Sequence, residues 1–441
     1  MYDPLTDKHL AAAQPMTASY WQKTTEREWP GSEKLPAQTD LLVIGGGYTG
    51  LNAALTLAKE YQCEVTLIDA NRLAWGCSGR NAGFVMKSTG RLGLAQWAAK
   101  TDERTALRIA DEHQQALELV EHHIQQCPDH CDVQRGGYIK LAHNAGAISP
   151  LRQQYQQLRQ FQQPVSWLSA DNLSDYLRSD NARAGIKFDD CFSLNPLKLA
   201  AATAKQAANS GVRLVENCSA LSVKRLANGW QLATTEGDVR CRKLLVCTNA
   251  YIANSLIPAL QGRSLPALSS IITTPPLTDE QLASTGLQPQ HAYMDTRKLK
   301  YYFRLLPDKR ILMGGRGAIS GKHAQRPVYA EQLLSALKGS FPGLQELRSW
   351  DDFWSGWVSV SLDNYPRVGA VGDDLYTAIG YCGAGVSFSA LAGRRLAQAA
   401  MGESLPTLPY YQMPLKRFPL ARLRRLGQWA YYHYARVSDS L

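Results

Sequence analysis

The chain has 441 residues and a formal net charge of +10, and 45% of its residues are hydrophobic while 20% are charged. This composition excludes a disordered protein, and the length is enough for roughly two or three domains. The basic residues are scattered except near the C-terminus and no nucleic-acid-reading motif occurs, so we expect no nucleic-acid partner.

The cysteines and the N-terminus bear on the compartment. Nine cysteines have no framework spacing, and the polar N-terminus lacks the apolar segment of a secretory signal. No run approaches the roughly 18–20 apolar residues of a membrane helix. We therefore expect a cytoplasmic protein with reduced thiols. The histidines and cysteines within 122–131 lack the spacing of a common zinc site, so no metal is expected.

Residues 1–36 are polar and contain four prolines, which predicts an irregular N-terminal arm. The arm contains the run Ser19-Tyr20-Trp21. Two interpretations of this run are open: an aromatic anchor against the body of the protein, or one buried tryptophan in a loosely held tail.

The stretch 40–69 has the order of parts that a dinucleotide pyrophosphate requires. An apolar strand leads into Gly45-x-Gly47-x-x-Gly50, and an amphipathic helix and a second strand ending in Asp69 follow. Gly45 makes the turn, Gly47 lets the diphosphate approach the backbone, and Gly50 allows close packing. The helix N-terminus offers free N–H groups, and Asp69 suits ribose hydroxyls but repels an NADP phosphate. NAD and FAD remain alternatives at this point.

A loop rich in Gly, Ser, Arg and Asn follows at 73–83. Standing alone, such a loop is usually a surface turn. Because it comes directly after the strand that ends in Asp69, we expect it to fold back over the phosphates and ring of the cofactor.

Periodicity predicts the elements of the middle of the chain. The expected helices are 91–127, 149–162, 197–210 and 329–340. The expected strands are 134–142, 212–216, 219–225, 230–234, 238–241, 243–250, 269–274, 299–306 and 310–314. The strand 243–250 ends in the Thr248-Asn249 turn, and ligands bind at such strand ends in open α/β sheets.

Charged and aromatic residues crowd into 295–304. Because side chains alternate along a strand, Tyr302 and Arg304 point one way while Tyr301 and Phe303 point the other. One face lines a substrate pocket in one interpretation; in the other it is simply solvated.

The chain then forms a final strand–turn–helix unit at 376–381, 382–385 and 386–401. A second glycine-rich turn onto a helix N-terminus is not needed by an ordinary NAD site. It suits a flavin, whose pyrimidine carbonyls take negative charge on reduction.

The tail 410–441 mixes basic and aromatic residues. This composition fits peripheral contact with a membrane surface, at the inner membrane face of a cytoplasmic protein. It fits equally a helix packed on the body with its basic face in water.

These motifs together resemble the D-amino-acid-oxidase-like (DAO) FAD oxidoreductases, or glycine-oxidase group, and most of all the γ-glutamylputrescine oxidase branch. The resemblance rests on the segments 44–51, 75–83, 247–251, 302–304, 314–316 and 380–386, and it covers nearly the whole chain. The branch often has other residues where Cys77, Cys382 and Ala384 stand, and a basic residue is common at Trp357. These departures leave the substrate open.

The resemblance implies an α/β (mixed α+β) fold. A discontinuous Rossmann-like FAD-binding domain with a three-layer ββα sandwich would comprise 37–90, 191–254 and 351–409. A substrate domain on a mixed or antiparallel sheet would comprise 91–190 and 255–350. The arm 1–36 and the tail 410–441 would flank them.

The resemblance also implies site residues. The glycine turn would hold the pyrophosphate, Asp69 the ribose and the loop from Ser78 the flavin, while Leu221 would offer its backbone to adenine. No histidine falls in 75–83, so FAD is expected to be noncovalent. The implied cofactor-binding residues are Gly45, Gly47, Tyr48, Thr49, Gly50, Asp69, Ala70, Gly76, Ser78, Gly79, Arg80, Asn81, Ala82, Gly83, Leu221, Thr248, Asn249, Gly356, Gly383, Gly385 and Val386.

The expected reaction is oxidation of the C–N bond of a small amine or amino acid to an imine by hydride transfer to flavin, with O2 as acceptor and peroxide as product. An acidic substrate would pair with Arg304, Arg297 or Arg316, and a polyamine with Asp295. Tyr301 and Tyr302 would bracket the substrate. The alternatives are a membrane-associated dehydrogenase that passes electrons to quinone and a flavin-binding protein without turnover.

Overall fold

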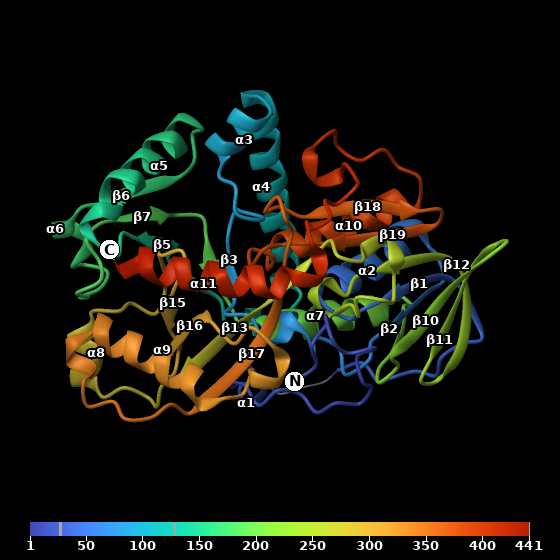
Figure 1. Cartoon of the computed structure of the whole chain (residues 1–441), viewed down its shortest axis with the longest axis horizontal. Coiled ribbons are helices and arrows are strands. Elements are labelled where there is room, and N and C mark those ends of the chain that lie inside the picture. The colour runs from blue at the N-terminus through green and yellow to red at the C-terminus, as the bar shows by residue number, and fades with distance from the viewer. Residues whose placement is uncertain (26–28, 128, 441) are drawn as a thin grey trace.

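The computed structural model describes residues 1–25, 29–127 and 129–440. Residues 26–28 of the predicted arm and residue 441 of the predicted tail lie outside the described residues. Within the described part the strands form two eight-stranded sheets and one three-stranded sheet (Figure 1).

The first large sheet contains the glycine-turn unit. Its path runs β10-β11-β12-β1-β2-β9, and β19, which pairs with β18, joins the second half of β12. The central pairs β1–β2, β1–β12, β2–β9 and β12–β19 are parallel, and the β10–β11–β12 meander is antiparallel. Its strands are β1 (Gln38–Ile44), β2 (Val65–Ile68), β9 (Arg213–Val215), β10 (Ala220–Leu226), β11 (Gly229–Thr234), β12 (Gly237–Val246), β18 (Arg367–Gly372) and β19 (Leu375–Ile379).

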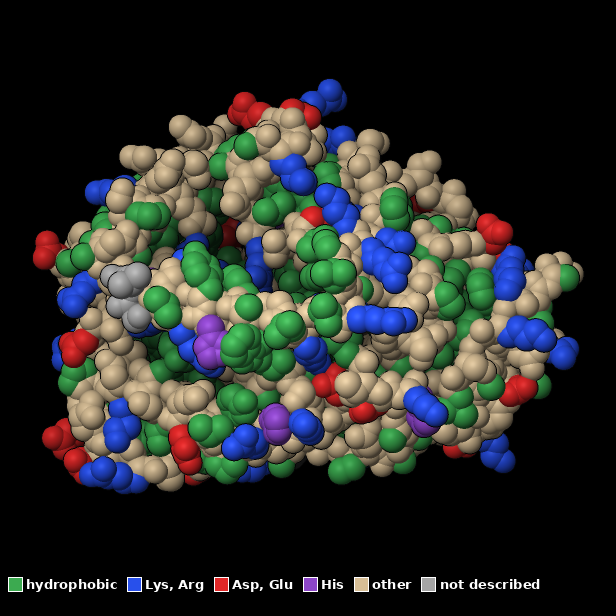
Figure 2. Space-filling model, viewed as in Figure 1, with side chains coloured by type: hydrophobic (Ala, Val, Ile, Leu, Met, Phe, Trp, Pro, Cys, Tyr) green, Lys and Arg blue, Asp and Glu red, His purple; other side chains and the backbone are tan. Residues whose placement is uncertain are grey.

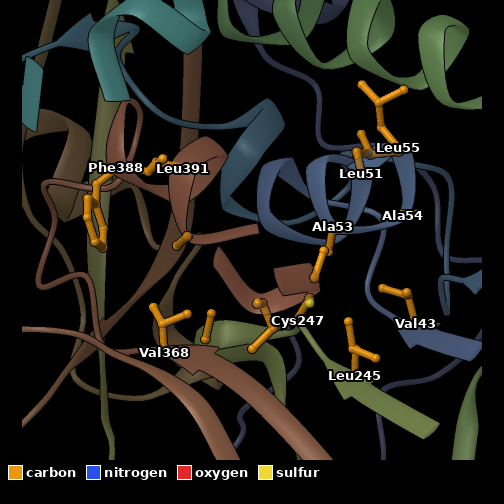
Figure 3. Close-up of a cluster of buried hydrophobic side chains, with 14 of the residues drawn as sticks. Val43, Leu51, Ala53, Ala54, Leu55, Leu245, Cys247, Val368, Phe388 and Leu391 are labelled. Carbon is orange, nitrogen blue, oxygen red and sulfur yellow. The ribbon is translucent and has the colours of Figure 1, made fainter. Parts of the chain in front are cut away.

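The two faces of this sheet follow the alternation of apolar residues along β1. Leu41 and Val43 face a core shared with the helices α2 (Tyr48–Tyr61), α7 (Pro196–Asn209) and α10 (Phe388–Ala400) (Figure 3). Leu42 and Ile44 face a second core formed with the meander. The result is a layered α/β unit in which the β1–α2 turn opens at the carboxyl end of the sheet.

The second large sheet is mixed, in the order β17-β13-β16-β15-β14-β5-β7-β6, and its only parallel pair among the described strands is β14–β5. The helices α8 (Asp279–Thr285) and α9 (Pro327–Ser340) adjoin it in Figure 1, and α9 packs into the core on one face of the sheet. Its strands are β5 (Tyr138–Leu141), β6 (Val165–Leu168), β7 (Gly185–Phe188), β13 (Leu265–Thr273), β14 (Ala292–Asp295), β15 (Tyr302–Leu305), β16 (Ile311–Arg316) and β17 (Asp352–Val360).

Smaller elements connect the two sheets. In Figure 1 the helices α3, α4 and α5 lie at the top of the view, and β3 of the three-stranded sheet β3-β8-β4 lies below α4. These elements are β3 (Phe84–Val85), α3 (Leu94–Lys100), α4 (Glu103–Gln125), β4 (Gln134–Arg135), α5 (Ile148–Gln160), α6 (Ala170–Leu173) and β8 (Phe192–Ser193).

Two expected elements differ from the structure. The single helix expected at 91–127 is two helices, because the Asp102 side chain caps α4 by accepting a hydrogen bond from the Thr105 N–H. The two strands expected within 238–250 are one strand, β12, which pairs first with β11 and then with β1 and β19. Both differences arise from tertiary pairing or capping rather than from periodicity.

The N-terminal arm is anchored to the body. It contains one short helix, α1 (Tyr20–Lys23), and the side chain of Trp21 is buried. The indole of Trp21 donates to the Asn81 carbonyl at 2.9 Å, and the indole of Trp357 donates to the Tyr2 carbonyl at 2.7 Å. Of the two interpretations of the arm, the aromatic anchor is the one the structure shows.

The tail forms α11 (Arg424–Ser440), which packs on the body with its buried Tyr432 and Ala435. Two of its basic residues bind the body: Arg425 pairs with Asp3, and Arg424 donates to Asn254. The tail is therefore a helix packed on the body, as one of the two interpretations expected, and its exposed face carries apolar side chains as well as Arg436. No described helix is both long and apolar enough to cross a bilayer.

Candidate active site

A cavity of about 920 Å³ lies where the carboxyl ends of the first sheet meet the inner face of the second. Asp69, Cys247 and Thr248 line it from the first sheet, and Ser269 and Tyr302 line it from the second. Its volume is at the upper end of the roughly 300–1,000 Å³ that is typical of ligand sites. One continuous hollow thus joins the glycine turn to the mixed sheet.

The glycine turn forms one end of the cavity. Gly45 has a φ of +105°, which L side chains rarely adopt, and a Cβ on Gly47 would lie 2.8 Å from the Ser78 Oγ. That hydroxyl accepts a hydrogen bond from the Tyr48 N–H at 3.0 Å, and the Thr49 hydroxyl bonds the Tyr381 hydroxyl at 2.8 Å. The N-terminus of α2 therefore reaches the cavity beside the Ser78 hydroxyl, and a helix N-terminus of this kind suits a pyrophosphate.

Asp69 lines the same end of the cavity. Its carboxylate accepts hydrogen bonds from the Gly46 N–H at 2.7 Å and the Asn71 N–H at 2.9 Å. Burial raises the pKa of Asp69 to about 6 despite these two bonds. The carboxylate is thus held in place with acceptor capacity left over for the hydroxyls of a ribose.

Buried polar atoms along the cavity have no partner within the described residues. They are Nη2 of Arg80, Oγ1 of Thr248 and Oγ of Ser389. Arg80 is otherwise fixed, because its Nε donates to the Trp75 carbonyl at 2.7 Å and its Nη1 to the Ser355 carbonyl at 3.2 Å. Buried polar groups nearly always have partners. These atoms therefore fit a polar cofactor that extends from the glycine turn along the 75–83 loop.

The far end of the cavity is a second helix N-terminus. Gly383, Gly385 and Val386 line it just before α10, and Gly356 of β17 lies among the lining residues as well. A helix N-terminus stabilises negative charge, so this end fits the pyrimidine edge of a flavin. Cys77 and Cys382 also line the cavity, and burial raises the pKa of Cys77 to about 11.

Tyr302 is the polar group of β15 that faces the cavity. Its hydroxyl bonds the Ser269 Oγ at 2.8 Å, and burial raises its pKa to about 12. A Cβ on Gly314 would lie 2.2 Å from the ring, so only glycine leaves room for this tyrosine. Phe84 makes an edge contact with the same ring. Tyr302 is therefore rigidly placed with its hydroxyl facing the cavity.

Three of the predicted catalytic residues do not line the cavity. The Arg304 side chain is 1% exposed. It donates hydrogen bonds to the Gln134 Oε1 at 3.0 Å and to the Leu194 carbonyl at 2.7 Å, so it stabilises the core. Asp295 is buried in an ion pair with Arg297, and Tyr301 lies on the α9 side of the sheet. Arg297 does line the cavity. Arg304 was expected to bind an acidic substrate and Asp295 a polyamine, but neither side chain is among those that line the cavity.

Most of the predicted cofactor residues are brought together at the cavity, and four are not. A Cβ on Gly50 would lie 1.9 Å from the Gly45 carbonyl oxygen, and Gly79 and Gly83 are similarly pressed against backbone. The Leu221 side chain is exposed, and the lining ends at Ala220. The residues that line the cavity as predicted are Gly45, Gly47, Tyr48, Thr49, Asp69, Ala70, Gly76, Ser78, Arg80, Asn81, Ala82, Thr248, Asn249, Gly356, Gly383, Gly385 and Val386.

Sequence reasoning missed five basic residues that line the cavity: Lys87, Arg91, Lys140, Lys298 and Lys300. Strand alternation could have found Lys140, since it shares a face of β5 with Tyr138, another lining residue. Arg91 and Lys300 lie in connecting segments, which carry no periodic signal. Arg316, named among the acidic-substrate candidates, lies at the end of β16 and also lines the cavity.

The fold is an α/β arrangement whose cavity, between a glycine-turn sheet and a mixed sheet, fits a flavin dinucleotide. The model of the family "FAD dependent oxidoreductase" (DAO) matches residues 40–399. The chain belongs to this family. It is therefore an enzyme of the FAD-dependent oxidoreductase class, as its motifs predicted.

Relatives cover almost the entire chain. The chain is 28% identical to the γ-glutamylputrescine oxidoreductase of Escherichia coli over 94% of this chain and 97% of that one. Among solved structures it is similar to glycine oxidase from Geobacillus kaustophilus, with a TM-score of 0.71 at 19% identity, covering 87% of this chain and 100% of that one. It is also similar to L-proline dehydrogenase from P. horikoshii, with a TM-score of 0.69 at 18% identity, covering 89% and 99%. These likenesses confirm the mixed α/β fold.

Proposed function

We propose that the protein oxidises the C–N bond of a small amine or amino acid, with noncovalently bound FAD and with O2 as the acceptor. The observation that carries this proposal is the single cavity that joins the Asp69 end to the Tyr302 end. The amine specificity is supported by the γ-glutamylputrescine oxidoreductase relative, which matches nearly the full length. The absence of histidine from 75–83 supports a noncovalent cofactor.

When bound, FAD supplies the acceptor for the hydride that leaves the carbon next to nitrogen, and the substrate becomes an imine that water hydrolyses. The residues of this chain position the reactants. Tyr302, fixed by Ser269, presents a hydroxyl to the substrate side of the cavity. The N-terminus of α10 stabilises negative charge at the opposite edge. The high pKa of Tyr302 keeps this hydroxyl protonated, so it is a hydrogen-bond donor rather than a base.

Anaerobic mixing of the purified holoenzyme with a panel of amines and amino acids tests this proposal. We expect the flavin absorbance to bleach with at least one member, and peroxide to form when air is admitted. Failure of every amine and amino acid to bleach the flavin would instead support a flavin-binding protein without turnover.

A second candidate function is a dehydrogenase that passes electrons to quinone at a membrane, and α11 is the observation that favours it. Leu423, Leu426, Tyr434 and Val437 recur at helical spacing on its exposed side, where Leu426 and Tyr434 are each 60% exposed. Tyr431 of the same helix lines the cavity. Figure 2 shows apolar side chains across this face, with basic side chains around them and a hollow alongside.

The occupant that we propose for this face is a bilayer with anionic lipids, because exposed basic residues, including Lys416, Arg417 and Arg422, lie in the chain just before α11. Flotation with anionic and with neutral vesicles tests it, with Leu426→Asp as the variant. Electron transfer to a soluble quinone analogue without peroxide formation would select the dehydrogenase. Rapid peroxide formation and no vesicle binding would select the oxidase.

A further inference from the structure

Beyond Tyr302, four basic side chains from four separate segments line the cavity. Arg91 precedes α3, Lys140 lies on β5, Lys300 precedes β15, and Arg316 ends β16. The other cations of the lining have partners: Lys87 pairs with Asp190 at 2.6 Å and Arg297 pairs with Asp295, while Lys298 donates to the Ser438 hydroxyl and Arg80 donates to two backbone carbonyls.

The four cations have no such partners in the described part of the chain. None of them takes part in an ion pair there, and Lys140 bonds only the neutral Gln154 Oε1, at 2.6 Å. Arg91 and Lys300 are exposed to the hollow, while Lys140 and Arg316 are half-buried. Their charged ends are therefore available to a ligand inside the cavity.

These cations are deep enough in the protein to repel one another. Burial lowers the pKa of Lys140 to about 7, and Lys300 adds repulsion. Burial also lowers the pKa of Lys300 and of Arg91, and Arg316 contributes repulsion to both. Like charges held together in a desolvated hollow are unfavourable unless an anion joins them.

The register of the mixed sheet gives the cluster two ends. Arg316 lies on β16, two residues beyond Gly314, which pairs with Tyr302. Lys300 lies just before β15. Lys140 lies on β5, which β14 separates from β15, because Met294 pairs with Tyr302 on one side and with Lys140 on the other. One carboxylate would leave most of this charge uncompensated, whereas two carboxylates would reach both ends.

We propose that the substrate is an amine that carries two carboxylates, and that Arg316 and Arg91 hold one while Lys300 and Lys140 hold the other. This inference rests on the proposed amine oxidation and names the substrate class of that site. Polyamines are disfavoured, because four cations repel them and the carboxylates of Asp190 and Asp295 are already paired with Lys87 and Arg297. Charge-assisted bonds from arginine suit carboxylates in particular.

Binding of unreactive probes to the holoenzyme tests the anion site without turnover. The probes are succinate and glutarate, the monocarboxylates of the same lengths, the matching diamines and inorganic phosphate. Binding is measured by perturbation of the flavin spectrum and by the shift in Tm. We expect the dicarboxylates to bind at least about tenfold more tightly than the monocarboxylates, and the diamines not to bind.

Two charge-removing variants and a matched control locate the site. Lys300→Met and Arg316→Met are expected to weaken dicarboxylate binding at least about tenfold. Lys309→Met removes the same charge from the turn between β15 and β16, outside the cavity lining, where its ammonium pairs with Asp279 at 2.7 Å, so binding should change less than about twofold. The Tm of each variant without ligand shows whether it is folded.

Each contrary outcome has a separate meaning. Equal binding of dicarboxylates and monocarboxylates, or unchanged binding in both variants, would overturn the inference while amine-dependent bleaching still supported the proposed function. Phosphate binding as tightly as dicarboxylates would overturn the carboxylate assignment. Dicarboxylate binding with the expected variant pattern, but no bleaching by any amine, would overturn the proposed function.

Discussion

The two ends of the cavity are built in different ways. The dinucleotide end is formed by backbone from two short stretches, 45–50 and 69–83, with Asp69 as its fixed carboxylate. The substrate end is formed by side chains from β5, β15, β16 and two connecting segments. Contacts from the backbone need residues without a side chain, because an added Cβ would collide with its neighbours. Contacts from side chains need the charged or polar group that each residue carries. Substitutions should therefore destroy the first end by adding atoms and the second by removing charge.

The largest effect is expected at Gly50. A Cβ there would lie 1.9 Å from the Gly45 carbonyl oxygen, so Gly50→Ala must displace α2 from the turn. We expect a loss of stability of about 3 kcal/mol and loss of bound FAD, measured by thermal unfolding and by flavin absorbance per protein. Gly31→Ala, where nothing lies within 4 Å, is the control and should keep both. Full flavin content in Gly50→Ala would refute the backbone argument.

A variant of Arg304 distinguishes a role in the core from a role in the site, because Arg304 shares a face of β15 with Tyr302 but does not line the cavity. Arg304→Met leaves the Gln134 and Leu194 oxygens without their donor. We expect about 2–3 kcal/mol lower stability in unfolding experiments, with kcat/KM per folded enzyme changed less than about threefold. A large loss of kcat/KM without a loss of stability would place Arg304 back in the site.

For Tyr302 we expect the opposite result, a loss of activity without a loss of stability. Tyr302→Phe keeps the ring and removes the hydroxyl that bonds Ser269. We expect kcat/KM for the best amine to fall by about tenfold, because one oriented hydrogen bond is lost, while the Tm stays nearly constant. An unchanged kcat/KM with the same amine would show that the hydroxyl does not act on the substrate.

Asp69 should make the affinity for FAD depend on pH. A carboxylate that accepts hydrogen bonds from ribose hydroxyls is favoured in its charged form, so protonation of Asp69 should weaken FAD binding. Because the pKa of Asp69 without FAD is about 6, FAD affinity should fall as the pH drops below 6 and level off above it. Asp69→Asn should bind FAD about tenfold more weakly and lose this pH dependence, as measured by flavin titration of apoprotein. The same slope in the variant would assign the effect to another group.

What could be predicted from the sequence follows the same division. The turn at Gly45, the strand end at Asp69 and the α10 turn are contiguous motifs, so their place at one cavity was predictable. The alternation on β15 correctly separated Tyr302 from Phe303. It could not show that Arg304 ends under Trp21, or that Asp295 is already paired, because both depend on neighbours far away in the chain. For the same reason, the sequence could not predict that Arg91 and Lys300 line the cavity.

The smallest effect, and the one that tests the substrate end most finely, is expected at Lys140. Its charged neighbour is Lys300, and Gln154 of α5 is its neutral partner. The pKa of Lys140 is about 7 when no ligand is bound, and a bound carboxylate favours the protonated form. Dicarboxylate affinity should therefore fall by about three- to tenfold between pH 6 and 8 as this ammonium loses its proton. Lys140→Met should bind with the weaker affinity at both pH values. If the wild-type slope persisted in that variant, a group other than Lys140 would cause it, and the assignment of Lys140 to the second carboxylate would be wrong.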